Sequence, residues 1–161
     1  MINIIHKKLH FILSWTAVLL WLVLIFNLSA QPREQSNNLS TGVTEIIIET
    51  VERVVPNIDF DIEGINHLVR KNAHFFAYLL LGILVMNAFR KSRFKIRLAL
   101  LLTLIFCVLF AASDELHQLF VSGRGPQVAD VLLDSTGVIV GIGIYVLIGH
   151  LIRLNYSRPR K

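Results

Sequence analysis

Most of the side chains that could do chemistry lie in one segment, Ser113–Asp134, with the sequence SDELHQLFVSGRGPQVADVLLD. It holds four carboxylates, one histidine and one arginine: Asp114, Glu115, His117, Arg124, Asp130 and Asp134. Long apolar runs precede and follow the segment, so these ionisable groups lie at the boundary of an apolar environment. Desolvating charged groups there is costly, and packing alone does not require six of them together. We therefore expect this segment to carry the function.

The residue types indicate acid–base chemistry beside an anion. The aspartates can act as general acids or bases, or bind a hard cation through oxygen. His117, and His74 earlier in the chain, can transfer protons or ligate a transition metal. Lys71 and Arg124 can hold a phosphate or a carboxylate, the arginine through a two-pronged contact. This mixture suits a phosphate-bearing lipid headgroup.

These roles divide the candidate site residues into two groups. The candidate catalytic residues are His74, Asp114, His117, Asp130 and Asp134. The candidate substrate-binding residues are Lys71, Tyr78, Glu115, Gln118 and Arg124. The sequence has no HExxH or CxxC motif, so we expect no cofactor and no metal ligand, with a bound metal ion as the less favoured alternative. The same groups could instead form a polar network that only fastens helices, which leaves open whether the protein is an enzyme.

The elements that position these groups are membrane helices, because hydrophobic residues make up 54% of the chain and charged residues only 17%. Four apolar runs are visible, at Leu9–Leu28, Phe75–Phe89, Leu98–Ala112 and Val131–Ile152. A span needs about 20 residues, so the middle two runs are long enough only if His67–His74 and Ser113–Phe120 continue them as helix. We predict an all-α membrane protein, a single domain over 1–161 that forms a four-helix bundle. Its predicted spans are about 9–28, 67–89, 98–120 and 128–152.

Basic residues predict the orientation of the bundle. They cluster at Lys7 and Lys8, in RKSRFKIR at 90–97, and in the C-terminal tail from Arg153. Eleven of the 16 basic residues lie in these three segments, and none of the 11 carboxylates does. The positive-inside rule therefore predicts that both termini are cytoplasmic, and it explains the basic charge without a nucleic-acid partner. The first span is longer than the apolar core of a signal peptide, so we expect an uncleaved anchor.

The long connection between the first two spans has two predicted parts. Its polar beginning, SAQPREQSNNLSTG, contains Pro32 and Gly42 and suits a loop. Residues 43–55 show apolar side chains at helical spacing with glutamates on the other side, which predicts an extracytoplasmic amphipathic helix that ends at Pro56. We expect this helix to lie in the outer membrane interface or over the mouth of the bundle. Its acidic side disfavours anionic lipid, so packing on the protein is favoured. The next helix has Asp59 or Asp61 available as N-cap.

Three predicted spans carry polar stripes at helical spacing. The stripe on the second span is Lys71, His74, Tyr78 and Gly82. The stripe on the third is Asp114, His117 and Gln118, with Glu115 beside it. The stripe on the fourth is Asp130, Asp134, Gly137 and Gly141, and its two glycines form a groove where another helix can approach closely. At about 1.5 Å per residue, all three polar ends lie roughly 24–28 Å from the basic boundary, so we expect one shared cavity.

These stripes resemble a known family. The pattern RKNAHFFAYLLLG, followed by SDELHQLFVSGRGPQVADVLLDSTGVIVG, is similar to the VanZ-like family of bacterial membrane proteins, named for a teicoplanin-resistance factor. The resemblance covers about residues 10–150, and SAQP after the first span is similar to the family's Ser-Gln element. It implies a small multi-pass protein of the bacterial cytoplasmic membrane, linked in some members to low-level glycopeptide resistance. It implies no established reaction.

Three functions are compatible with these features. The first is an enzyme acting on a lipid-linked or cell-wall-related substrate, with membrane lipid or an envelope precursor as partner. The second is a binding or protective protein that hides such a precursor or the antibiotic. The third, a proton-coupled carrier, is less favoured because it requires deeper titratable groups and an inverted repeat.

Overall fold

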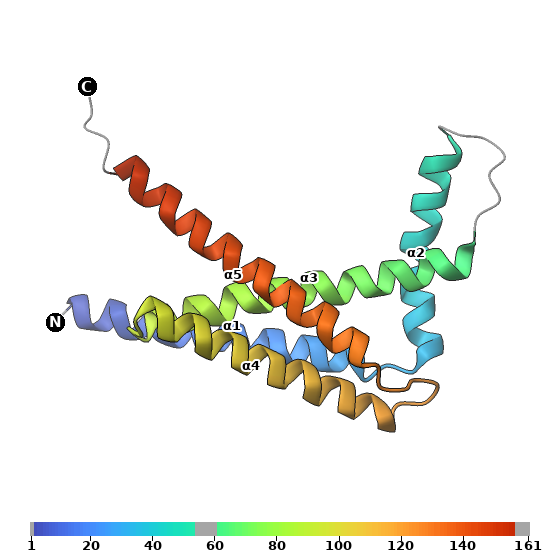
Figure 1. The fold of residues 1–161 in the computed structure, drawn as a ribbon, viewed down its shortest axis with the longest axis horizontal. Coiled ribbons are helices and arrows are strands. Elements are labelled where there is room, and N and C mark those ends of the chain that lie inside the picture. Colours follow the sequence, from blue (N-terminus) through green and yellow to red (C-terminus); the bar gives the residue numbers. More distant parts are fainter. Residues whose placement is uncertain (1, 54–60, 157–161) are drawn as a thin grey trace.

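The computed structural model describes residues 2–53 and 61–156 and shows a helical protein with no strand in these ranges (Figure 1). The helices are α1 (Ile2–Ser29), α2 (Arg33–Glu52), α3 (Ile62–Lys91), α4 (Ile96–His117) and α5 (Val128–Tyr156), with a 3-10 turn, η1 (Gln118–Phe120), after α4. Four of them, α1, α3, α4 and α5, are long and apolar enough to cross a membrane. The predicted all-α fold with four membrane-spanning helices is therefore confirmed.

Both middle spans gain their length from polar residues, as predicted. Helix α3 begins at Ile62 and runs through His67–His74 without a break. Asp61 is its N-cap, because its Oδ1 accepts a hydrogen bond from the backbone N–H of Gly64 at 3.0 Å. The alternative N-cap, Asp59, lies outside the described residues. Helix α4 continues through Ser113 to His117, and η1 extends it to Phe120.

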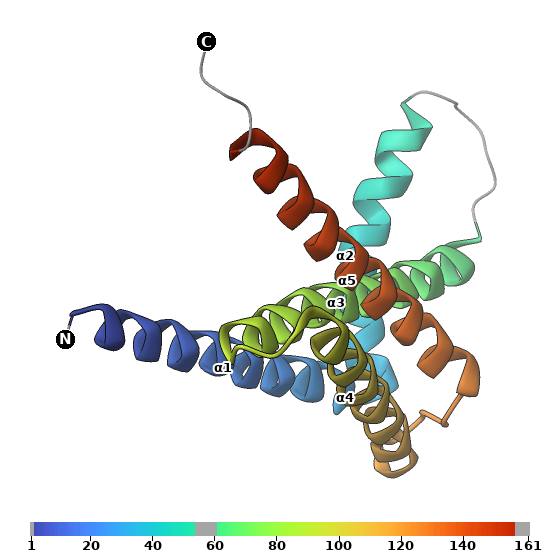
Figure 2. The ribbon, with the colours of Figure 1, turned by 60° about the vertical axis from the view of Figure 1, so that its left-hand side comes forward.

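Helix α3 is the centre of the bundle, and α1, α4 and α5 all pack against it (Figures 1 and 2). The buried core consists of apolar side chains from these four helices, among them Val18, Tyr78, Leu81, Cys107 and Val138. Helix α5 crosses α3 and then diverges from the other helices toward its C-terminal end (Figure 2). The described N- and C-terminal ends lie at one end of the bundle with the α3–α4 turn, and α2 and the η1–α5 loop lie at the other (Figure 1).

Glycines make the crossing of α3 and α5 close. A Cβ atom added at Gly82 would lie 2.8 Å from the carbonyl oxygen of Val138 on α5. Added Cβ atoms at Gly137 and Gly141 would clash in the same way with the α3 backbone, at Phe75 and Leu79. The predicted small-residue groove on the fourth span is therefore confirmed, and α3 is the helix that occupies it.

Helix α2 is longer than predicted. The expectation of a loop through Gly42 is wrong, since the helix begins at Arg33, directly after its N-cap Pro32. The polar side chains that suggested a loop satisfy backbone acceptors within the helix: Ser40 donates to the Ser36 carbonyl, and Thr41 to the Asn37 carbonyl. The expected end at Pro56 lies outside the described residues.

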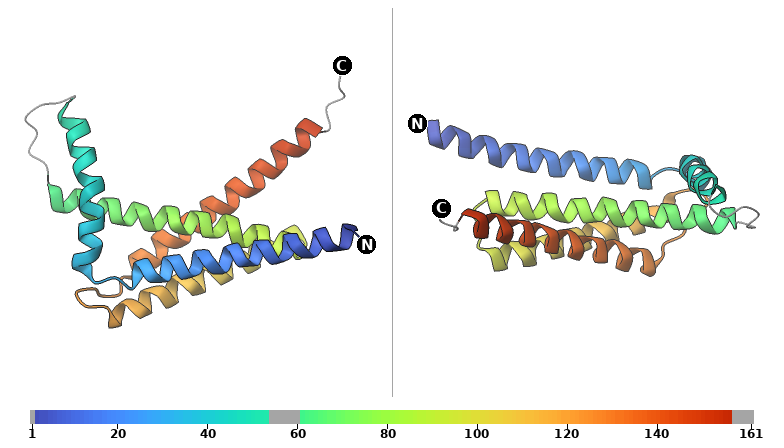
Figure 3. Two further views of the ribbon diagram at one scale, coloured as in Figure 1. Left: turned by 180° about the vertical axis from the view of Figure 1, so that it is seen from behind. Right: turned by 90° about the horizontal axis from the view of Figure 1, so that it is seen from above.

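Helix α2 runs across the ends of the spans and packs on α3 (Figures 1 and 3). Polar side chains make this contact: Thr44 donates to Asn66 at 3.3 Å, and Arg70 donates to Asn37 at 2.8 Å. Val43 is 48% exposed, so the apolar side of α2 does not form the contact with α3. The helix packs on the protein, as expected, but the side chains that make the contact are polar, and their low hydropathy would predict that they face solvent.

Candidate functional site

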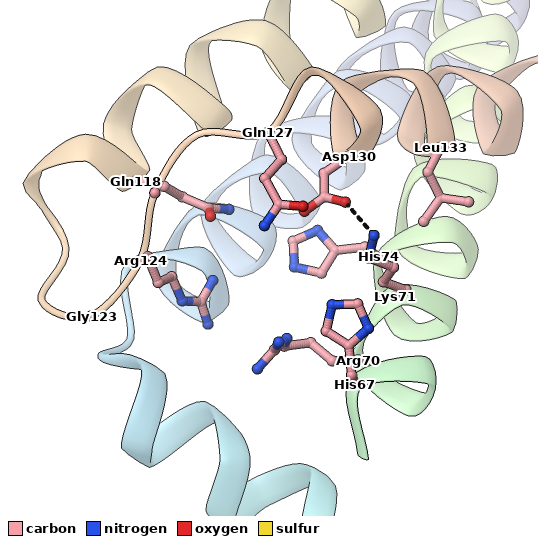
Figure 4. Close-up of a pocket in the computed structure, with 11 residues that line it drawn as sticks. His67, Arg70, Lys71, His74, Gln118, Gly123, Arg124, Gln127, Asp130 and Leu133 are labelled. Atoms are coloured by element: carbon pink, nitrogen blue, oxygen red, sulfur yellow. Dashed lines mark ion pairs between the residues drawn. The ribbon is translucent and has the colours of Figure 1, made fainter. Parts of the chain in front are cut away.

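A polar cavity opens at the end of the bundle opposite the termini, between the first turns of α3, the η1–α5 loop and the start of α5 (Figure 4). Its volume is about 110 Å³, far more than the roughly 10–15 Å³ that one water molecule needs. The residues that line it are His67, Arg70, Lys71, His74, Gln118, Gly123, Arg124, Gly125, Gln127, Asp130 and Leu133. Five of them carry basic side chains and one carries a carboxylate, so the lining favours an anion.

Two arginines dominate the mouth of this cavity. Arg70 comes from α3 and Arg124 from the η1–α5 loop, and Figure 4 shows both guanidinium groups directed into the space between them. Burial, followed by the proximity of Arg70, lowers the pKa of Arg124 from its usual value. The Arg124 guanidinium makes no hydrogen bond or ion pair within the ranges 2–53 and 61–156. Two cations held near each other in this way attract an anion that can bridge them.

Below the mouth, two ion pairs connect α3 to α5. Lys71 Nζ lies 3.1 Å from Asp130 Oδ1, and His74 Nδ1 lies 3.7 Å from Asp134 Oδ2. Lys71 and His74 lie three residues apart on α3, and their partners Asp130 and Asp134 lie four residues apart on α5. Both spacings keep the two side chains on one face of a helix, so the two predicted stripes lie side by side. The outer pair is partly exposed and therefore weak, whereas the Asp134 side chain is only 5% exposed.

Asp114 forms the deepest layer of the site. It is buried, and its Oδ2 accepts hydrogen bonds from Ser29 Oγ at 2.6 Å and from the Tyr78 hydroxyl at 3.4 Å. One carboxylate thus connects α1, α3 and α4, and Ser29 belongs to the SAQP element. The other oxygen, Oδ1, accepts no hydrogen bond within the described part of the chain, and the same is true of Asp134 Oδ1. Buried acceptors in this state are rare in proteins and often mark a functional site.

The remaining predicted residues have different placements. Glu115 accepts a hydrogen bond from the backbone N–H of Gln127, which fixes the η1–α5 loop, and Gln118 lines the cavity from η1. The His117 ring packs against Phe26 of α1, with ring centroids 4.5 Å apart. His117 therefore faces α1 and is not among the residues that line the cavity.

The structure thus sorts the ten predicted site residues into three groups. Those that line the cavity are Lys71, His74, Gln118, Arg124 and Asp130. Those buried behind it are Tyr78, Asp114, Glu115 and Asp134. Of the ten residues, five therefore share the cavity, four lie buried outside its lining, and His117 packs against Phe26 of α1.

Two lining residues with polar side chains were not predicted, Arg70 and Gln127. Arg70 lies four residues before His74, on the same face of the helix, so helical spacing could have identified it. Gln127 follows a proline in a loop and has no comparable sequence signal. His67 also lines the cavity, and it lies one helical turn before Lys71 on α3.

The carboxylates and histidines of the site do not form a cation-binding cluster. No three His, Cys, Asp or Glu side chains in the described ranges come together in a way that could hold a metal ion. The expectation that the protein uses no cofactor stays a prediction.

Comparison with known proteins agrees with this architecture. The model of the VanZ/LLP1 family matches residues 14–149, which include all the residues of the cavity and the buried layer behind it. No curated protein and no solved structure matches the chain. The family match covers most of the sequence, and four helices are able to span a membrane. The chain therefore belongs to the VanZ/LLP1 family of multi-pass membrane proteins, as its motifs predict.

Proposed function

We propose that this protein binds a phosphate-bearing headgroup of a membrane lipid or lipid-linked envelope precursor in the cavity and acts on it by acid–base catalysis. The observation that carries the proposal is the layering of the site. Two guanidinium groups lie at the mouth, and buried carboxylates with unused oxygens lie behind them. Cations positioned ahead of acid–base groups are an arrangement suited to chemistry on a phosphate ester.

The position of the cavity fits a substrate from the outer leaflet of the bacterial cytoplasmic membrane. The basic segments at Lys7–Lys8 and 90–97 belong to the opposite end of the bundle, which the positive-inside rule places in the cytoplasm. The cavity then lies at the level of the outer headgroups. A lipid-linked phosphate can reach Arg70 and Arg124 from there without crossing the bilayer.

The side chains behind the arginines supply the proton transfers. His74 lines the cavity, and Asp134 lies behind its ring with Oδ2 3.7 Å from Nδ1, on the side from which a carboxylate orients a histidine in many enzymes. Asp114 keeps one free oxygen beside this pair, while Ser29 and Tyr78 fix the other. A headgroup bound at the mouth therefore meets His74, and the buried carboxylates Asp134 and Asp114 behind it complete the proton-transfer groups.

A second candidate is a binding protein that shields an envelope precursor without altering it. The ion pairs Lys71–Asp130 and His74–Asp134 favour this binding function, because they neutralise groups that catalysis would use.

The link of VanZ-like proteins to teicoplanin resistance is compatible with either function, since modifying or covering a cell-wall precursor would both change the drug's target. Teicoplanin susceptibility of a host that expresses the protein tests this link.

The experiment uses purified full-length protein in vesicles that contain one probe lipid at a time. The probes are phosphatidic acid, phosphatidylglycerol and a polyprenyl phosphate, and diacylglycerol is the control without phosphate. Native mass spectrometry measures binding, and lipid mass spectrometry measures product. Two variants test the site: Arg124→Gln at the mouth and Asp114→Asn in the buried layer. Matched controls are Arg97→Gln and Glu49→Gln, which change exposed residues outside the cavity.

The catalytic proposal predicts that a phosphate lipid binds and is converted. Arg124→Gln should weaken binding, and Asp114→Asn should keep binding while lowering turnover by about 10²–10⁴-fold. Binding that depends on Arg124 without any product would favour the shielding protein. If Asp114→Asn lowers the unfolding free energy by about 3–5 kcal/mol and activity decreases in proportion to the folded fraction, the polar network only stabilises the helix packing. Equal binding of diacylglycerol and the phosphate lipids would contradict both functions.

A further inference from the structure

Helix α2 has three chemically different sides. The consecutive residues Val43, Thr44 and Glu45 point in directions about 100° apart, as in any α-helix. Thr44 is buried and faces α3, whereas Val43 and Glu45 are exposed on either side of that contact. The same three sides are occupied one helical turn later. Ile47, which is 40% exposed, follows Val43, half-buried Ile48 follows Thr44, and exposed Glu49 follows Glu45.

The two exposed sides of α2 therefore differ in character. Val43 and Ile47 form one side, and Ile46, which is 65% exposed, lies next to them. Glu45 and Glu49 lie on the other side. An amphipathic helix in water normally turns its apolar side to the protein, yet here polar side chains occupy the contact with α3. The apolar side thus needs an apolar environment outside the protein.

The position of α2 identifies that environment. The helix begins at Arg33, only a short turn after α1 ends at Ser29, and runs across the ends of the spans (Figures 1 and 3). A helix placed in this way lies at the depth of the lipid headgroups. One of its sides faces the bilayer and the opposite side faces away from it.

We infer that α2 lies in the membrane interface, with Val43, Ile46 and Ile47 inserted among the lipids and its glutamates turned to water. The partner is the bilayer surface itself. Charge agrees with this orientation, because glutamates turned away from the membrane avoid the repulsion of anionic headgroups. The inference rests on the membrane-spanning fold and does not depend on the proposed reaction.

This placement would connect the bilayer to the cavity. Asn37, on the protein-facing side of α2, accepts the 2.8 Å hydrogen bond from Arg70, and Arg70 lines the cavity mouth. Asn66 makes a second polar contact with the same part of α2, through Thr44. A helix anchored in the interface therefore holds one of the two arginines in position beside the lipid headgroups.

The test places a spin label on each side of α2 in the full-length protein, with one chain per lipid nanodisc. The variants Val43→Cys and Glu45→Cys form a matched pair, because both sites are exposed on the same helical turn and point in nearly opposite directions. The native Cys107 is buried, so it can remain. Wild-type protein treated with the same spin label shows whether Cys107 reacts. Collision with oxygen, which concentrates in lipid, is compared with collision with a water-soluble nickel chelate.

The label at position 43 should collide severalfold more with oxygen than with the nickel chelate, relative to the label at position 45. Equal access of the chelate to both labels would show that the apolar side faces water and would overturn the inference. Protection of position 43 only when two chains share a nanodisc would also overturn it, since a second copy would then be the partner.

Discussion

The crossing of α3 and α5 at Gly141 makes a sharp prediction about stability. In Gly141→Ala, the new Cβ would lie closer than 3.0 Å to the carbonyl group of Leu79. This obstacle is helix backbone, which cannot rotate away as a side chain can, so the two helices must separate. Overpacking of this kind costs about 1–3 kcal/mol, and the better helix propensity of alanine returns up to about 1 kcal/mol. We expect the variant to lose roughly 2 kcal/mol of unfolding free energy.

Gly143 provides the matched control on the same helix. A Cβ added there meets nothing within 4 Å, so Gly143→Ala should be neutral or more stable by up to about 1 kcal/mol. The propensity gain is common to both variants, so they should differ by the overpacking cost of roughly 1–3 kcal/mol, although the chemical change is identical. The assay is unfolding of the purified protein in mixed micelles by titration with a denaturing detergent, followed by circular dichroism.

The same variant also tests the link between packing and site. Asp134 lies two turns from Gly141 on α5, so separation of the helices should lengthen the distance of 3.7 Å between His74 and Asp134. Equal unfolding free energies for Gly141→Ala and Gly143→Ala would refute the close crossing, and with it the account of how α5 delivers its aspartates to α3.

Two further predictions concern the orientation and the α3–α4 turn. Ser122→Cys should react with a membrane-impermeant maleimide added outside intact cells, whereas Lys95→Cys should not; the opposite result would invert the topology. Arg93 has a positive φ of 67°, a conformation that suits glycine, so Arg93→Gly should raise the unfolding free energy by about 1 kcal/mol in the same detergent titration. An unchanged or lower value for Arg93→Gly would mean that the arginine side chain compensates for the strain.

The parts of the site that were predictable follow from helical periodicity. Lys71 and His74 on α3, and Asp130 and Asp134 on α5, lie on matching faces, and the structure pairs them as their spacing predicts. The close approach at Gly141 was equally visible, because small residues at regular spacing have few other roles in a membrane helix. Both features are local patterns along a single helix, which sequence alone can show.

The parts that were not predictable depend on contacts between segments. Residues 33–42 were expected to form a loop because they are polar, yet Asn37 and Thr41 form the side of α2 that faces α3. Hydropathy cannot distinguish a polar packing surface from a solvated one. His117 shares a helical face with Asp114, but its imidazole packs against the Phe26 ring on α1 and does not line the cavity. No pattern within α4 carries that information.

A high-resolution structure of the protein in a nanodisc with the phosphate lipid that it binds would test the central claim most directly. The proposed function predicts that the phosphorus atom lies between the guanidinium groups of Arg70 and Arg124, with phosphate oxygens in hydrogen-bond range of both. The reacting side of the headgroup should face His74 and Asp114. A structure in which Arg124 instead pairs with Asp114 or Glu115, and the headgroup binds away from the cavity, would contradict the account.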